Sequence, residues 1–307
     1  MLYWGRTGSA ALLRAGKPRH PSKESCDFAV NKKLMFFDID GTLAAPLSAP
    51  SQPVREAIRQ ARARGHLAFL CTGRNLPIIG PNILDIGFDG IVASAGAYVS
   101  AGGQVLLDSL LPEPLVQECL DVFHGLGVFC RIETPEGIYT DPQMEALLKS
   151  AAPDPRNSEL IRMQRELESG LHSRPYAEYP KKGAYKLCFT ATSPESLDRA
   201  RQALEDRFEF VVHPFARGAG CLNGEIIHRS VDKGRGIELV CRRLGAALED
   251  TIAFGDSMND AAMLRRAGVG IAMGNACEEL KALADAVCED VDHDGVYHEL
   301  LRRGLCG

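Results

Sequence analysis

The stretch that decides the fold is LMFFDIDGT, residues 34–42. Its apolar first half predicts a buried β-strand, which ends abruptly at two carboxylates, Asp38 and Asp40, followed by Gly41. In an open α/β sheet the carboxyl ends of parallel strands line the ligand crevice, so a rigid strand would deliver both acids to a site. Neighbouring carboxylates repel unless a cation lies between them or one carries a proton. The pair therefore predicts a hard divalent metal ion, with Mg²⁺ as the natural candidate.

A βαβ unit is predicted to follow this strand. Helix start signals, an apolar helical stripe and a glycine stop occupy residues 51–65, and a short apolar strand at 66–71 then leads into Thr72-Gly73-Arg74. Because the crossover is right-handed, both strands end on the same edge of the sheet. There Thr72 could donate its hydroxyl, and Gly73 its backbone N–H, to a phosphate oxygen. Arg74 is either a phosphate or substrate contact or a surface charge.

Charged groups also stand at element ends in the last third of the chain. Lys233 opens a predicted helix, where a cation opposes the helix macrodipole and needs an anion nearby, as a phosphate would supply. A buried strand leads into GDSMND at residues 255–260. Asp260 suits the first turn of the helix that follows. No such structural role explains Asp256 with Asn259 beside it.

Further core elements are predicted from apolar runs. Residues 89–94 are expected to form a third strand and residues 268–272 a sixth. Asn275 with Glu278 has the spacing of a capping box at the start of the next helix. The alternatives to Lys233 as the cationic phosphate contact are Lys181, Lys182 and Lys186, in the intervening segment.

These motifs carry a resemblance to a known family. Residues 38–42 resemble the first motif of the haloacid dehalogenase-like (HAD) phosphatases, residues 72–74 the second in its Cof-type form, Lys233 the third, and residues 255–260 the fourth. The resemblance implies an α/β fold, a Rossmann-like parallel-sheet core with an inserted α+β cap of class IIB. The chain departs from the Cof-like pattern at residues 95–97, where Ala-Gly-Ala replaces the usual Asn-Gly-Ala. A polar group that would face the site is therefore missing.

The same resemblance, with a change of pattern along the chain, predicts the domain organisation. Residues 34–97 and 230–307 are expected to form the catalytic core, and residues 98–229 an inserted domain that closes over the crevice, sets substrate choice and excludes water. Residues 1–33 are expected to be a flexible N-terminal extension. Three interpretations of this basic stretch stay open: a disordered tail, an upstream start codon ahead of a true start near Met35, and a transit-like leader.

The resemblance also implies a role for each motif residue. Asp38 would attack phosphorus to give an aspartyl-phosphate. Asp40 would protonate the leaving alkoxide and then activate water. Arg74 would contact the substrate. The implied Mg²⁺ ligands are Asp38, Asp40 through its main-chain carbonyl, Asp256 and Asp260, and the implied phosphate contacts are Thr72, Gly73, Lys233 and Asn259.

The predicted function is a Mg²⁺-dependent phosphatase for a small phosphorylated metabolite, either a sugar phosphate or a cofactor such as pyridoxal phosphate or flavin mononucleotide. Two alternatives stay open. A sugar phosphomutase would use the same Asp38/Asp40 pair and return the phosphoryl group to the sugar, and a non-catalytic protein would only bind the metabolite. A haloacid dehalogenase proper would not need the metal site. A transport ATPase would need membrane spans.

Composition limits the partners and the location. The chain has 307 residues, 45% of them hydrophobic and 24% charged, with net charge −5. This length suits about two domains, and the mild negative charge argues against nucleic-acid and membrane partners. The 10 cysteines show neither a C-x-x-C pair nor a His-flanked metal spacing, which is typical of buried thiols in a cytoplasmic protein. The sequence has no apolar run near the roughly 18 residues of a membrane span and no signal-peptide pattern. A monomer or a homodimer is expected.

Overall fold

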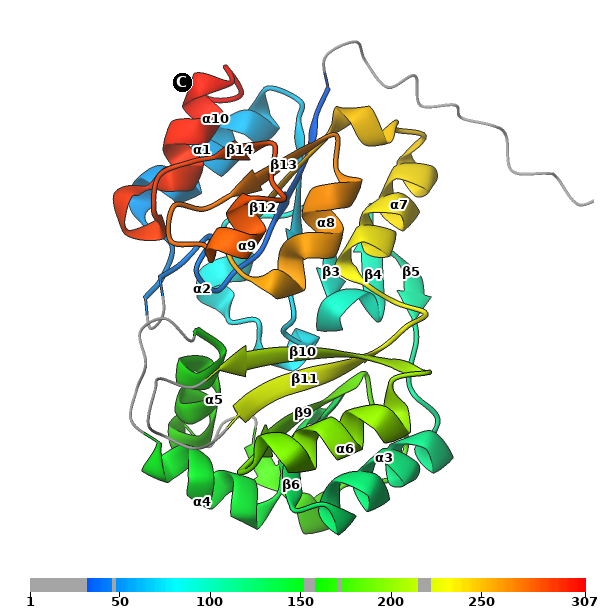
Figure 1. Ribbon diagram of the computed structural model, residues 1–307. Coiled ribbons are helices and arrows are strands. Elements are labelled where there is room, and N and C mark those ends of the chain that lie inside the picture. Colours follow the sequence, from blue (N-terminus) through cyan, green and yellow to red (C-terminus); the bar gives the residue numbers. More distant parts are fainter. Residues whose placement is uncertain (1–31, 46–47, 152–157, 170–172, 215–221) are drawn as a thin grey trace, which may run out of the picture.

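The protein is described by a computed structural model in which two β-sheets organise the chain (Figure 1). The described residues are 32–45, 48–151, 158–169, 173–214 and 222–307. The N-terminal extension expected over residues 1–33 lies outside them, apart from Lys32 and Lys33. Within the described ranges no helix is long and apolar enough to cross a membrane.

The larger sheet has eight strands in the order β14-β13-β12-β1-β2-β3-β4-β5. From β14 to β3 all neighbours pair in parallel, which confirms the predicted α/β core. The sequence predicted the central strands because their apolar runs are buried on both faces. The strands are β1 (Leu34–Phe37), β2 (Leu67–Cys71), β3 (Gly90–Ala93), β4 (Tyr98–Ala101), β5 (Gln104–Asp108), β12 (Thr251–Gly255), β13 (Val269–Ala272) and β14 (Ala286–Val287).

Helices cover both faces of this sheet (Figure 1). Side chains of β1 alternate between the two layers: Met35 and Phe37 pack in the cluster with α1 and α10, and Leu34 and Phe36 in the cluster with α7 and α8. The first layer contains α1 (Gln52–Ala63), α2 (Pro81–Leu84) and α10 (Gly295–Arg302), and the second contains α7 (Lys233–Leu244), α8 (Ala261–Arg266) and α9 (Glu278–Lys281). Short 3-10 helices occupy Leu76–Ile78, Ser94–Gly96, Tyr176–Glu178, Leu248–Asp250, Met258–Asp260 and Val291–His293.

The β4–β5 hairpin extends the edge of the larger sheet. Its turn lies at Gly102 and Gly103, which both have positive φ, 57° and 75°. However, β4 pairs antiparallel with β3, so a boundary between residues 97 and 98 falls among hydrogen-bonded strands of one sheet. A turn signal identifies a hairpin but carries no information on which sheet edge the hairpin joins.

The smaller sheet has six strands in the order β10-β11-β9-β6-β7-β8, antiparallel except for β7 with β8. We call this sheet with helices α3 to α6 the cap. Helices α3 and α6 lie on the side of the cap sheet away from the larger sheet (Figure 1), and α4 and α5 pack on its other face. The elements are α3 (Glu113–Gly125), β6 (Val128–Thr134), β7 (Gly137–Thr140), α4 (Pro142–Ser150), α5 (Ser158–Ser169), β8 (Ser173–Pro175), β9 (Lys186–Ala191), α6 (Pro194–Leu204), β10 (Phe208–Pro214) and β11 (Leu222–His228).

The cysteines of the described ranges are free thiols, and all of them except Cys277 are buried. Cys26 and Cys221 lie outside these ranges. Most of the buried thiols pack in the hydrophobic clusters of the two sheets, where a cysteine behaves as a small apolar residue. Their environment is therefore the one that the sequence predicted.

Candidate active site

Three neighbouring strands of the larger sheet end at the same edge, and each is followed by a motif residue. β1 lies between β12 and β2. Asp38 follows β1, Thr72 follows β2 and Asp256 follows β12. The Asp38 N–H still donates to the Phe254 carbonyl (3.0 Å), so the strand pairing extends up to this acid. Parallel pairing therefore brings together motifs that are more than half the chain apart.

Lys233 connects the first motif to the fourth. It is the first residue of α7 and is buried, and its Nζ donates to Asp38 Oδ1 (2.8 Å) and Asp260 Oδ1 (2.6 Å). Asn259 Oδ1 lies 3.4 Å from the same nitrogen. Burial alone would lower the pKa of Lys233, but attraction to Asp260 and Asp38 outweighs burial and raises it well above its ordinary value. The sequence predicted an anion next to a lysine at this helix end, and in the structure the neighbouring anionic groups are carboxylates.

Three carboxylates gather around this lysine. Oxygens of Asp38, Asp256 and Asp260 all lie within 4.8 Å of one another. The pKa of Asp38 is raised to about 7, mainly by burial and then by the charges of Asp260 and Asp40, against the opposing attraction of Lys233. Burial, followed by Asp260 and Asp38, also raises the pKa of Asp256 well above its ordinary value. A divalent cation would offset this repulsion, and a ligand set made only of oxygens suits Mg²⁺.

Asp260 is held by a capping box at the start of the Met258–Asp260 turn. Its Oδ2 accepts the backbone N–H groups of Asp256 (3.0 Å) and Ser257 (3.1 Å), and its Oδ1 accepts from Lys233. The first-turn role that the sequence suggested for Asp260 is therefore present together with the contact to Lys233. Both roles fix the position of Asp256 beside Asp38.

The capping box expected at Asn275 and Glu278 is wrong. Cys277 is the N-cap of α9 and makes no side-chain capping bond. Asn275 instead donates to the Gly41 carbonyl (2.8 Å) and accepts from the Val291 N–H (2.9 Å). Asn275 has the local spacing of a capping residue, but its side chain binds a loop more than 200 residues away in the sequence. Local sequence patterns cannot reveal such a contact.

Arg74 binds the carboxylate of Asp40 with two hydrogen bonds, Nε to Oδ2 (2.8 Å) and Nη2 to Oδ1 (2.6 Å). The sequence offered a phosphate or substrate contact or a surface charge for Arg74, and in the structure its side chain is 20% exposed and pairs with Asp40. A contact of Arg74 with the substrate stays a prediction. Burial would lower the pKa of Arg74, but Asp40 outweighs it and raises that pKa. The Asp40 side chain is thus turned to a different partner from that of Asp38, two residues earlier.

Thr72 and Gly73 lie beside these groups. The Thr72 hydroxyl is buried and accepts the Arg74 N–H (3.1 Å). A Cβ built on Gly73 would lie 3.5 Å from Lys186 Nζ and 3.7 Å from Asn259 Nδ2. Lys186 belongs to β9 of the cap, so a cap side chain reaches the edge of the larger sheet. All the motif residues that the sequence singled out are brought together at this edge.

Apart from Lys186, the cap contributes buried polar side chains that the sequence analysis did not assign to the site. Arg131 and Glu133 in β6 alternate with apolar neighbours, and Lys186 and Glu225 lie on the same face of the cap sheet. Lys186 forms ion pairs with Glu225 and, at 3.8 Å, with Glu133. The period-2 placement of charges within an otherwise apolar strand was the available signal.

The chain resembles known proteins over most of its length. A family model described as haloacid dehalogenase-like hydrolase matches residues 35–300. The 5-amino-6-(5-phospho-D-ribitylamino)uracil phosphatase YwtE of Bacillus subtilis (strain 168) is 28% identical over 278 residues, 87% of this chain and 96% of that protein. The structure of the HAD subclass IIB sugar phosphatase BT4131 is 26% identical with a TM-score of 0.71, covering 89% of this chain and all of that one (100%). The structure of a haloacid dehalogenase-like hydrolase from B. subtilis is 25% identical with a TM-score of 0.74, covering 88% of this chain and 99% of that one.

Proposed function

The chain belongs to the haloacid dehalogenase-like hydrolase family and is a phosphatase, and we propose that it hydrolyses small phosphorylated metabolites with Mg²⁺ through an aspartyl-phosphate. One observation carries the proposal: Asp38 and Asp40, two residues apart, have different partners. Asp38 contacts Lys233 beside Asp256 and Asp260, whereas Asp40 is held by Arg74. Two carboxylates in different environments suit two different chemical roles.

Asp38 is the proposed nucleophile and Asp40 the proposed acid and base. A carboxylate oxygen of Asp38 forms a bond to phosphorus as the bond to the alkoxide leaving group breaks, and Asp40 gives its proton to that alkoxide. Water then attacks the phosphorus of the aspartyl-phosphate, and Asp40 takes the proton from that water. Inorganic phosphate leaves and Asp38 is regenerated.

The remaining motif residues bind the ion and the transferring group. The carboxylates of Asp38 and Asp256 and the main-chain carbonyl of Asp40 would hold Mg²⁺, with Asp260 orienting them. The bound ion supplies the positive charge that lets an anionic nucleophile approach an anionic ester. The phosphoryl oxygens would be held by Thr72, Gly73, Lys233 and Asn259.

We propose a substrate whose leaving group bears several hydroxyls, such as a sugar or ribityl phosphate. The buried charges of Arg131, Lys186 and Glu225 offer fixed donors and acceptors on the cap, and polar groups that converge on a pocket give orientation and specificity. A Cβ on Gly73 would lie 3.5 Å from Lys186 Nζ, so this cap side chain lies next to a proposed phosphate contact. The activities named for YwtE and BT4131 concern leaving groups of this kind. Pyridoxal phosphate and flavin mononucleotide belong in the same substrate panel.

The surroundings of the enzyme are also part of the proposal. The free thiols of the described ranges support a cytosolic location, where such thiols stay reduced. The net charge of −5 supports a small-molecule substrate over a nucleic-acid or membrane partner. Size-exclusion chromatography with light scattering decides between the expected monomer and homodimer.

The test is phosphate release from a panel of phosphomonoesters, with Mg²⁺ and with EDTA. We expect release that EDTA abolishes and that Asp38→Asn lowers on the order of 10⁴-fold or more. Asp206→Asn is the matched control, because Asp206 is an exposed acid that pairs with its neighbour Arg207, and it should retain full activity. Isomerised sugar phosphate without free phosphate, or binding without turnover, would overturn the proposal. Normal turnover by Asp38→Asn would overturn the mechanism.

A further inference from the structure

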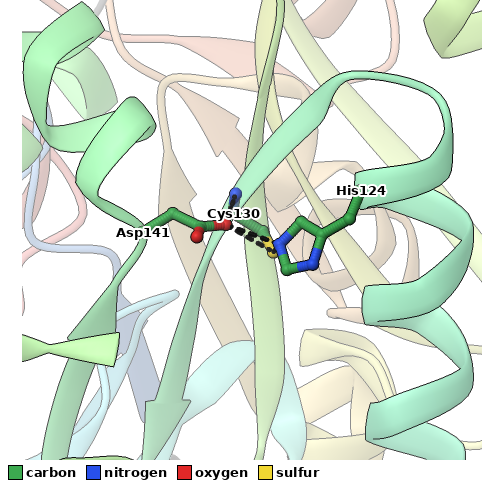
Figure 2. Close-up of side chains that lie close together, drawn as sticks. All are labelled: His124, Cys130 and Asp141. Atoms are coloured by element: carbon green, nitrogen blue, oxygen red, sulfur yellow. Dashed lines mark hydrogen bonds and ion pairs between the residues drawn. The ribbon is translucent and has the colours of Figure 1, made fainter. Parts of the chain in front are cut away.

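The cap contains a second group of side chains of types that can bind a metal ion, on elements other than those that carry the motif residues. Figure 2 shows His124, near the end of α3, Cys130, in β6, and Asp141, just before α4, with their side chains directed toward one another. One possible ligand atom of each lies within 4.8 Å of the others. Nε2 of His124 is 2.7 Å from Asp141 Oδ2, and Cys130 Sγ is 3.6 Å from that oxygen and 3.9 Å from Nε2.

These separations are close to those of a zinc ligand triangle. Tetrahedral Zn²⁺ with its usual bond lengths to sulfur, nitrogen and oxygen places the ligand atoms about 3.3–3.6 Å apart. The observed triangle therefore needs only a small movement of the imidazole. The His124 side chain is 37% exposed at a helix end, so its ring has room to shift. The other two ligands are buried, which fixes two corners of the site.

The Asp141 side chain does not cap the helix that it precedes. Asp141 is the N-cap residue of α4, yet its side chain caps no N–H of that helix. Its Oδ2 instead accepts the Cys130 N–H (3.1 Å), and its own N–H donates to the Cys130 carbonyl (3.0 Å). The Tyr176 ring packs edge-on against the His124 ring, with 5.9 Å between centroids. The backbone and the packing thus hold the three side chains in this arrangement.

We propose that His124, Cys130 and Asp141 bind one Zn²⁺ ion, with solvent in the fourth position on the exposed side of the imidazole. The ion joins α3, β6 and the start of α4, which already meet through side-chain packing and the hydrogen bonds of Asp141. A thiolate with an imidazole and a carboxylate is a ligand set for Zn²⁺ and is unsuited to Mg²⁺, which takes oxygen ligands. The site is therefore chemically distinct from the three-carboxylate group of the larger sheet.

The site also lies on the other face of the cap sheet from the charged groups next to Gly73. Cys130 packs in the cluster with α3 and α6, whereas its neighbour Arg131 points to the opposite face. Burial, and next to it the charge of Asp141, raise the pKa of Cys130 well above its ordinary value. An unliganded Cys130 is consequently a poor nucleophile, and a cation beside it reverses this effect.

Cobalt substitution tests the proposal, because a Co²⁺–thiolate bond gives a ligand-to-metal charge-transfer band that oxygen ligands do not. The reduced, chelator-treated full-length protein is titrated with Co²⁺ in excess Mg²⁺, and the band is then displaced with Zn²⁺. We expect one equivalent of each ion per chain. His124→Ala should weaken Zn²⁺ binding at least about 100-fold, because even groups outside the ligand set change affinity about 10–100-fold. Cys130→Ala should abolish the band.

Cys119→Ala is the matched control, since Cys119 is a buried cap thiol outside this group. It should bind both ions like the unmodified chain. Absence of the band in the unmodified chain, or an unchanged affinity in His124→Ala, overturns the proposal. The His124 side chain is 37% exposed at the end of α3, so its variant tests binding without disturbing the core. Circular dichroism of the metal-free variants confirms that each is folded.

Discussion

The Arg74 guanidinium holds both carboxylate oxygens of Asp40, with Nε 2.8 Å from Oδ2 and Nη2 2.6 Å from Oδ1. Such a two-pronged pair fixes the direction of the carboxylate as well as its charge. It keeps the Asp40 side chain apart from the group formed by Asp38, Asp256 and Asp260. Arg74 is therefore a positioning residue for the proposed acid and base.

Replacing Arg74 should lower kcat through Asp40. We expect Arg74→Ala to reduce kcat about 100-fold, which is the low end of what an oriented acid or base contributes. Arg74→Lys should recover only part of this loss, because lysine keeps the charge but lacks the planar fork. The measurement is steady-state kinetics with an alkyl phosphate and with p-nitrophenyl phosphate, whose leaving group depends less on protonation.

A double-mutant cycle distinguishes this role from a direct substrate contact. If Arg74 acts through Asp40, Arg74→Ala should have little further effect on kcat in an Asp40→Asn background. Fully additive losses, or a change confined to KM, would show that Arg74 contacts the substrate instead.

Gly41→Ala should abolish activity through a steric effect on Asp256. Gly41 has φ +81°, and a Cβ there would lie 2.2 Å from Asp256 Oδ2. The control is Gly65→Ala, since Gly65 also has positive φ (+93°) but no atom within 4 Å of its would-be Cβ. Both variants should lose about 1–2 kcal/mol of unfolding free energy from backbone strain. Only Gly41→Ala should lose Mg²⁺-dependent phosphate release, and equal activity in the two variants would contradict this.

Lys233→Met should strongly destabilise the metal-free protein. It leaves the buried Asp38 and Asp260 without their shared cation, and breaking a buried pair in this way costs about 3–5 kcal/mol. Lys33→Met removes a partly exposed ion pair with Asp250 and should cost about 0–1 kcal/mol. Urea denaturation in EDTA measures the free energy of unfolding of both variants. A loss for Lys233→Met no larger than for Lys33→Met would show that the buried pairs contribute little.

The metal-free protein should become less stable as the pH rises. Burial raises the pKa of Asp38 from 3.8 to about 7, so the folded state retains a proton that the unfolded state releases above its lower pKa. Stability from this group is thus complete at acid pH and decreases between about pH 4 and pH 7. Asp256, shifted in the same direction, adds to the decrease.

Thermal melts in EDTA and in Mg²⁺ across this range measure the effect. Mg²⁺ should reduce the fall in Tm, since the ion binds the ionised carboxylates. The Tm of Asp38→Asn should fall less steeply with pH than that of the unmodified chain. The Tm of Asp206→Asn should change with pH as that of the unmodified chain does. A Tm in EDTA that rises from pH 5 to about pH 7 would contradict the expected sign.

Much of the core could be predicted from local chemistry. The apolar run before Asp38 has no polar position, which is typical of a strand buried on both faces, and it is β1 between two helical layers. Parallel pairing then puts the residues after β1, β2 and β12 at one edge, so the convergence of Asp38, Thr72 and Asp256 follows from strand ends alone. The catalytic and metal-binding roles of these residues stay predictions until the variants are measured.

The sequence by itself determined the core strands β1, β2, β3, β12 and β13 and the motif residues that follow them, because periodicity, caps and turns act over a few residues. Only the tertiary structure decided the partners. It paired Arg74 with Asp40, joined the β4–β5 hairpin to the larger sheet, and assembled His124 with Cys130 and Asp141. Each depends on how separate elements pack, and packing brings together side chains whose distance along the chain carries no local signal.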